Sequence, residues 1–175
     1  MRKLIEAILI ASVFVVASTQ HAIALGVGDT VENVQVRDAN DKPAAIPDLG
    51  KKVIALFYTD PDEKEQNEPF REMLKLNKFD RTRYRGMGIA NLKDTWKPNF
   101  LVRKIIRRKI EKFKSLILTD PDHILKNKWD LGDCNEKDVV IIIGKDKKVY
   151  YIKKGPMTNA EKHKGIDLVR ELMKK

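Results

Sequence analysis

An uninterrupted run of β-branched and aromatic residues, from Val53 to Tyr58, leads directly into a polar segment that begins at Thr59. A strand that is apolar at every position is buried on both faces, as in the parallel strands of α/β domains. The Asp60-Pro61-Asp62 cluster behind it is typical of a turn that leads to a helix N-terminus. This unit predicts an α/β fold with a central sheet flanked by helices.

The rest of the chain alternates between strand and helix patterns. An extended segment is expected over 28–37 and a turn over 38–43. Further strands are expected at 84–91, 115–118, 139–143 and 148–153. Helices are expected at 65–76, 99–113, 124–129 and 159–173. The turn over 144–147 joins the last two strands into a hairpin, so the order predicts a mixed sheet with helices around it.

The first residues form a separate unit. Arg2 and Lys3 precede an apolar stretch from Leu4 to Ala17, and small residues lead up to Ala24. This pattern predicts a cleavable signal peptide over residues 1–24, followed by a single domain over residues 25–175. An uncleaved anchor is the alternative, but the stretch is shorter than the ~20 residues that a span needs. We therefore expect a periplasmic protein with no transmembrane span after signal removal.

Composition limits the partners of this domain. A hydrophobic content of 42% and a charged content of 34% indicate a globular chain, and about 150 residues suffice for one core. The net charge of +10 favours anionic partners. For an exported protein these are an anionic lipid surface or an acidic envelope protein, and export argues against nucleic acid. The charge is equally consistent with a role in solubility alone.

Few side chains suit nucleophilic or acid–base catalysis. Cys134 is the only cysteine, so the fold must be stable without an intramolecular disulfide. Its acidic neighbours, Asp133 and Glu136, are expected to raise the pKa of the thiol, and we interpret Cys134 as a loop thiol without a role. A periplasmic thiol oxidoreductase or peroxiredoxin-like enzyme relying on Cys134 stays open as an alternative. His123 and His163 are interpreted as surface histidines.

Three stretches resemble the thioredoxin-like superfamily: 53–69, 116–129 and 139–149. Within it, the chain is similar to the YtfJ-type exported proteins of bacteria. Short motifs carry this similarity: Arg83-Tyr84, Ile89-Ala90-Asn91, Phe100 to Arg103, Trp129-Asp130-Leu131 and Gly155 to Thr158. The resemblance implies a thioredoxin-like α/β fold, with a central mixed β-sheet flanked by helices.

The same resemblance shows what the chain lacks. Aligned on Phe57 and Tyr58, the paired redox cysteines of thioredoxins fall at Asp62 and Glu65, which cannot exchange disulfides. The proline expected before the strand at 139–143 is replaced by Asp138 or its neighbour. We therefore expect a scaffold without the oxidoreductase chemistry, no cofactor, and a non-catalytic binding role in the periplasm.

Acidic residues gather at this degenerate active-site edge, where open α/β sheets bind ligands. The candidate binding residues are Asp60, Asp62, Glu65 and Asp138. Helix capping alone can account for carboxylates at a helix N-terminus. A hard-cation site is a third interpretation, but no glycine-containing calcium-loop spacing accompanies the cluster, so no metal is expected.

The segment 99–113 has the strongest charge pattern in the chain. Apolar residues at helical spacing predict a face buried against the sheet: Val102, Ile105, Ile106, Ile110 and Phe113. Residues on the basic side are candidates for binding an anionic surface: Arg103, Lys104, Arg107 and Arg108. Each basic group near such a surface contributes up to ~1 kcal/mol. A solvated helix face without function is the alternative, and a basic membrane-surface-associated or regulatory protein is a further possible function.

Overall fold

A computed structural model describes residues 24–175, so nearly all of the expected signal peptide lies outside the described residues. Seven strands form one mixed sheet in the order β2-β1-β5-β4-β3-β6-β7. Three central strands are parallel: β3 (Val53–Thr59), β4 (Tyr84–Asn91) and β5 (Ile117–Asp120). The others pair antiparallel: β1 (Gln35–Arg37), β2 (Pro43–Ala45), β6 (Asp138–Ile143) and β7 (Val149–Lys154). The α/β class and the mixed sheet expected from the sequence are confirmed.

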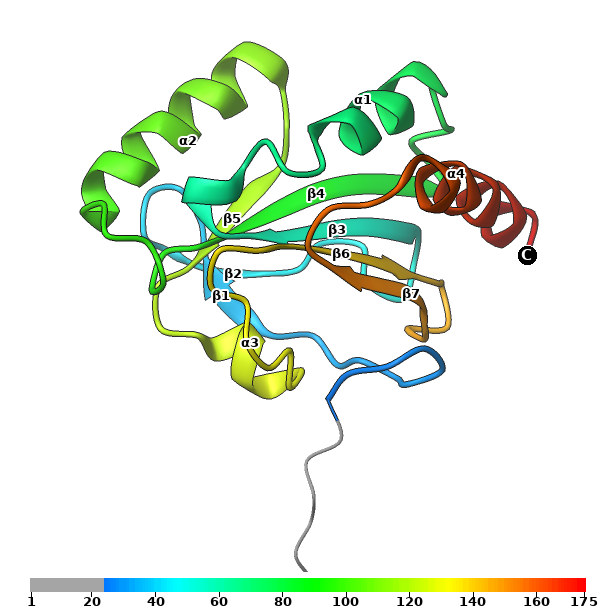
Figure 1. The fold of residues 1–175 in the computed structure, drawn as a ribbon, viewed down its shortest axis with the longest axis horizontal. Helices are drawn as coiled ribbons and strands as arrows, with labels where there is room; N and C mark the ends of the chain where they lie inside the picture. The colour runs from blue at the N-terminus through cyan, green and yellow to red at the C-terminus, as the bar shows by residue number, and fades with distance from the viewer. Residues whose placement is uncertain (1–23) are drawn as a thin grey trace, which may run out of the picture.

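Helices cover both faces of the sheet (Figure 1). One side carries α1 (Glu68–Leu76), α2 (Asn99–Phe113) and α4 (Asn159–Lys174), and the other carries α3 (Ile124–Lys128). A short 3-10 turn, η1 (Pro61–Glu63), precedes α1. Among residues 24–175, none of the helices has the length and apolar character needed to cross a membrane.

Strand β3 divides the core into two halves because its side chains alternate between the faces of the sheet. Val53, Ala55 and Phe57 are buried with side chains of α1 and α4. The intervening residues, of which Tyr58 is the last, are buried with side chains of α3 and of the N-terminal segment. Burial on both faces explains why this strand is apolar at every position.

The N-terminal segment is bonded into the domain from Leu25 onward. The Leu25 N–H donates to the carbonyl of Asp130 at 3.1 Å, and the Gly28 N–H donates to the carbonyl of Val149 at 2.8 Å. Thr30 then forms an antiparallel bridge with Lys148. The segment therefore contacts both the connection after α3 and the β6–β7 hairpin.

Most element boundaries lie within one residue of those expected, but strand β2 was not expected, and only Gln35–Arg37 of the extended segment 28–37 forms a strand. Two further elements begin later than expected. Helix α1 begins at Glu68 instead of Glu65, because η1 forms a separate turn and Asn67 takes the N-cap position. Strand β5 begins at Ile117 instead of Ser115, because Lys114 ends α2 in a left-handed conformation with φ of 50°. Its pairing with β4 then extends β5 to Asp120.

Candidate functional site

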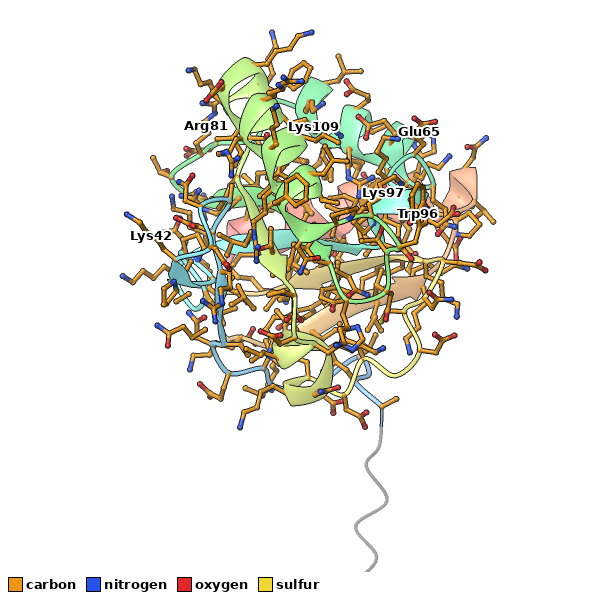
Figure 2. The ribbon with its side chains drawn as sticks, turned by 90° about the vertical axis from the view of Figure 1, so that its left-hand side faces the viewer. Lys42, Glu65, Arg81, Trp96, Lys97 and Lys109 are labelled. Carbon is orange, nitrogen blue, oxygen red and sulfur yellow. The ribbon has the colours of Figure 1, made fainter. Side chains whose placement is uncertain are left out.

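The carboxyl ends of β3, β4 and β5 meet the start of β6 at one edge of the sheet, which faces the viewer in Figure 2. The fully buried polar and charged residues within 24–175 gather at or beside this edge: Asp60, Asn67, Asn91, Thr119, Asp120 and Asp138. Buried polar groups are costly unless they are hydrogen-bonded. Their partners therefore decide which of them is free to bind anything else.

Asp138, the first residue of β6, is fully buried in an ion pair with α1. Arg71 Nη2 lies 2.9 Å from each of its carboxylate oxygens, and Thr59 Oγ1 donates to Oδ1 at 2.6 Å. Burial raises the pKa of Asp138 even though Arg71 opposes the shift. The guanidinium also lies 4.2 Å from the centre of the Phe57 ring. Asp138 thus joins helix to sheet and offers no free oxygen at the surface.

Asp60 follows β3 directly and is also buried. Its Oδ1 accepts from the Asp62 N–H at 2.9 Å, and its Oδ2 accepts from the Glu136 N–H at 3.0 Å. Burial, helped by the charge of Asp94, raises the pKa of Asp60. The capping interpretation is confirmed for this residue, which also fixes the loop before β6.

The two residues that align with the missing cysteines lie in different environments. Asp62 accepts from Thr95 Oγ1 at 2.8 Å and forms an ion pair with Lys97. The Glu65 side chain is 84% exposed, and within residues 24–175 its one ion pair is with its neighbour Lys64, at 3.4 Å. The four candidate acids therefore do not converge on one point. Over residues 24–175, no three or more His, Cys, Asp or Glu side chains are grouped so that they could hold a metal ion.

Asp120, at the end of β5, is a buried carboxylate that the sequence did not single out. Its Oδ1 accepts from the Ile124 N–H at 2.8 Å, and its Oδ2 accepts from the Leu125 N–H and from Tyr58 Oη, both at 3.1 Å. Burial, followed by the charge of Asp120, raises the pKa of Tyr58. The Thr-Asp-Pro-Asp sequence over 119–122, which repeats that of 59–62, was the available signal, and in the structure it again forms a turn that leads into a helix.

His123 is not the surface histidine that was expected. Its Nε2 lies 2.9 Å from Asp94 Oδ1, and Lys126 Nζ lies 3.5 Å from the other oxygen of the same carboxylate. His123 is half-buried and takes a left-handed backbone conformation, with φ of 58°. The surface interpretation is wrong because the connection between β4 and α2, which carries Asp94, contacts the start of α3. No local pattern relates these two segments.

Cys134 lies on the loop before β6, as expected, but its side chain is buried with Tyr58 and Leu131. The thiol lies 3.6 Å from the carbonyl oxygen of Gly132. Burial is the largest cause of its raised pKa, and Asp133 adds only a smaller contribution. A buried, protonated thiol is a poor nucleophile at neutral pH.

The connection between β4 and α2 presents a large aromatic side chain to solvent. Trp96 is 82% exposed, and Lys97 Nζ lies 5.1 Å from the centre of its ring. Thr95 and Lys97 both contact Asp62, so the loop is fixed on each side of the indole. In Figure 2, Trp96, Lys97 and Glu65 lie on the same side of the molecule. Sequence reasoning missed Trp96 because nothing in its neighbourhood distinguishes an exposed tryptophan from a buried one.

The candidate basic residues of α2 divide into two pairs. Arg103 Nη2 lies 2.6 Å from Asp41 Oδ1, and Arg107 Nη1 donates to the carbonyl of Ala39 at 2.7 Å. These two arginines therefore hold the turn between β1 and β2. Lys104 and Arg108 are exposed.

The prediction of the apolar face of α2 is partly wrong. Val102 and Ile106 are buried, but Ile105 is 42% exposed and Phe113 is 60% exposed. Helix α2 buries only a narrow stripe, which packs with Ala90 and Leu92 at the end of β4. Residues beside this stripe stay in solvent although their spacing is helical.

Several solved structures share this architecture. The exposed lipoprotein thioredoxin Etrx1 of Streptococcus pneumoniae is 15% identical, with a TM-score of 0.58, and the match covers 81% of this chain and 100% of that one. A peroxiredoxin-like protein of Aquifex aeolicus is 16% identical, with a TM-score of 0.58 and coverage of 86% and 89%. A SCO1/SenC family lipoprotein of Bacillus anthracis is 17% identical, with a TM-score of 0.54 and coverage of 82% and 94%. These likenesses show that the fold is thioredoxin-like.

Comparison of sequences identifies the family of this chain. A search of curated proteins found no match. A family model described as a bacterial protein of unknown function, YtfJ_HI0045, matches residues 44–172, which run from β2 into α4 and include the whole edge described above. The resemblance found in the short motifs is thereby confirmed, and the chain belongs to the YtfJ_HI0045 family of bacterial proteins.

Proposed function

We propose that this protein is an exported interaction protein that uses the thioredoxin-like scaffold without thiol chemistry. The observation that carries the proposal is the environment of Cys134, the chain's only cysteine, which is buried and has a raised pKa. The aligned thiol positions hold Asp62, engaged by Lys97, and Glu65, which faces solvent. The edge can therefore contact a partner but has no accessible thiolate to transfer electrons.

The proposed contact surface consists of Trp96, Lys97 and Glu65. Exposed tryptophans are common energetic centres of protein interfaces, where a few residues dominate the binding energy. The bonds from Thr95 and Lys97 to Asp62 hold the loop before any partner arrives, which lowers the entropic cost of binding. An envelope protein is the partner that this surface best fits.

Export is part of the same proposal. The basic start, the apolar stretch and the small residues before Ala24 support it. Fractionation of cells that produce the tagged full chain, with N-terminal sequencing of the released form, tests it. A periplasmic product that begins at Leu25 supports export, and a cytoplasmic product with its first residues intact contradicts it.

Site-specific photocrosslinking in intact cells tests the contact surface. A photoreactive amino acid replaces Trp96 in one variant and Lys42, an exposed residue on another side of the molecule, in a second (Figure 2). We expect one discrete protein adduct from position 96, none from position 42, and loss of the adduct when Asp62→Ala frees the loop. The same adducts from both positions, or none from either, would overturn the proposal.

A thiol oxidoreductase or peroxiredoxin-like enzyme relying on Cys134 is the alternative, favoured by the names of the thioredoxin and peroxiredoxin-like neighbours. It requires turnover of a disulfide or a peroxide that Cys134→Ser abolishes. Absence of turnover in the wild-type protein removes this alternative. Turnover that depends on Cys134 would replace the interaction proposal.

A further inference from the structure

Exposed apolar side chains gather on one element. The large hydrophobic residues that remain exposed within 24–175 are Val27, Leu76, Trp96, Phe100, Leu101, Ile105, Phe113 and Ile124. Most of them lie on α2 or on the loop that enters it. Single exposed apolar residues are ordinary, but a concentration of them on one helix marks an interaction surface.

The positions on α2 show which side of the helix they share. Successive residues of a helix are rotated by about 100°, so residues three and four apart lie on one side. The side opposite Val102 and Ile106, which are buried, contains seven exposed residues: Phe100, Leu101, Lys104, Ile105, Arg108, Glu111 and Lys112. We refer to these seven as the outer face of α2.

The charge of the outer face is unbalanced. No ion pair forms at Lys104, Arg108 or Lys112 within the described part of the chain, whereas Arg103 pairs with Asp41. Glu111 is the only acidic residue of α2. The positive charges therefore face solvent among apolar side chains, and their hydrocarbon stems can lie along an apolar layer while the charged groups stay in a polar one.

We propose that the outer face of α2 binds the surface of an anionic phospholipid bilayer, with the helix lying parallel to the membrane plane. Helices that lie at this interface combine aromatic and aliphatic side chains with lysines and arginines, as this face does with Phe100, Leu101 and its basic residues. Leu101 and Ile105 would enter the boundary with the acyl chains, and Lys104, Arg108 and Lys112 would contact lipid phosphates.

A bilayer fits this face better than an acidic protein does. Apolar side chains lie toward the start of the outer face and basic ones lie beside and beyond them, so a partner must offer an apolar layer directly behind a negatively charged one. A lipid interface has this layered arrangement everywhere. The inference concerns a surface different from Trp96 and Glu65 and does not rest on the interaction proposed for them.

Vesicle sedimentation of the full chain, purified after processing, tests the proposal. We expect binding to vesicles that contain phosphatidylglycerol, a decline with added salt, and no binding to pure phosphatidylcholine. Lys104→Glu with Arg108→Glu should weaken binding roughly 30-fold or more, from about 1 kcal/mol for each charge removed. Leu101→Ser with Ile105→Ser should also weaken binding, but without changing how binding depends on salt. Arg107 is unsuitable for charge reversal because its side chain holds the carbonyl of Ala39.

The matched control reverses two exposed lysines outside α2, Lys51→Glu with Lys164→Glu, which produces the same net charge. Circular dichroism checks that every variant is folded. Equal loss of binding in the control variant would mean that charge alone, and not the outer face, determines the association. Wild-type protein that fails to sediment, or that binds an acidic protein at this face and no vesicle, would overturn the proposal.

Discussion

Arg71 Nη2 lies 2.9 Å from both carboxylate oxygens of Asp138, so a single guanidinium nitrogen ties α1 to the first residue of β6. The carboxylate is fully buried, whereas the arginine is 19% exposed. The position just before Val139, where the resemblance to thioredoxins places a proline, is thus occupied by one partner of an internal ion pair.

Arg71→Ala should destabilise the protein by about 3 kcal/mol, since removing one partner of a buried pair leaves a charge without compensation. The deficit should shrink as the pH falls. Burial raises the pKa of Asp138 and Arg71 opposes this rise, so removing Arg71 raises the pKa further and the variant gains more stability on protonation than the wild type does. Urea unfolding of wild type and variant between pH 7 and pH 4 measures both effects.

Arg170→Ala is the control, because the pair between Arg170 and Asp167 is exposed and should contribute less than about 1 kcal/mol. A cost for Arg71→Ala that equals this control, or that does not change with pH, would contradict the role assigned to the buried pair.

Cys134 should react with an alkylating reagent at least about 100-fold more slowly in the native protein than in urea, because burial hides the thiol and raises its pKa. Mass spectrometry of timed samples gives both rates. A cysteine placed at Lys42 in a Cys134→Ala background should react at similar rates in both states. A native rate for Cys134 near the unfolded one would show that the loop opens readily.

The two tryptophans should respond differently to truncation. Trp129 is buried and its Nε1 donates to the carbonyl of Glu32 at 2.9 Å, so Trp129→Ala should cost about 3–5 kcal/mol. Trp96→Ala should change stability by less than about 0.5 kcal/mol, because its side chain lies in solvent. Thermal or urea unfolding separates them, and a large loss for Trp96→Ala would mean that its ring supports the fold.

Gly165→Ala should destabilise the protein although alanine is the better helix former by about 1 kcal/mol. A Cβ at Gly165 would lie 2.8 Å from Cζ of Phe70, whose ring is fully buried between α1 and α4. Overpacking of this kind costs about 1–3 kcal/mol. The double variant with Phe70→Leu should recover part of the loss in a double-mutant cycle. Stabilisation by Gly165→Ala alone would show that Phe70 can move aside.

Thr158 and Glu161 form a capping box at the start of α4, and Thr158→Ala should cost about 1 kcal/mol. Hydrogen bonds from Thr158, with Lys153 nearby, lower the pKa of Glu161 to about 2 from its ordinary 4.5. Because the folded pKa is the lower one, the stabilisation is present above pH 4.5 and is lost as the pH falls toward 2. Glu161→Gln should therefore flatten the acid limb of the stability curve, and an unchanged limb would contradict this.

Patterns in the sequence were sufficient for the helices and for the central strands, but not for β2, whose first residue, Pro43, was expected to be part of a turn. The strands at 53–58 and 139–143 are apolar at every position because both faces are buried, and a local window contains that information. Helix 99–113 was predicted with its observed limits. Amphipathic spacing does not reveal how wide a stripe the neighbouring strands will cover, so Ile105 and Phe113 were placed in the core and lie in solvent.

The edge of the sheet was predicted less well, because its partners come from distant segments. Capping by Asp60 is local and could be expected. The contacts of Asp138 with Arg71 and of Asp94 with His123 depend on tertiary packing, which no periodicity encodes. The same holds for Trp96, whose exposure follows from the path of a loop held by Asp62.

The hydrogen bond from the Leu25 N–H to the Asp130 carbonyl has a consequence for the order of maturation. If cleavage follows Ala24, the amide of Leu25 becomes the new terminal ammonium group, which keeps its donor role and gains a positive charge. A signal peptidase must hold the residues on both sides of the cut in its own cleft, so Leu25 cannot be bonded to Asp130 while it is being cut. Cleavage and docking of this segment therefore exclude one another, and a precursor that docks Leu25 first would be protected from the peptidase.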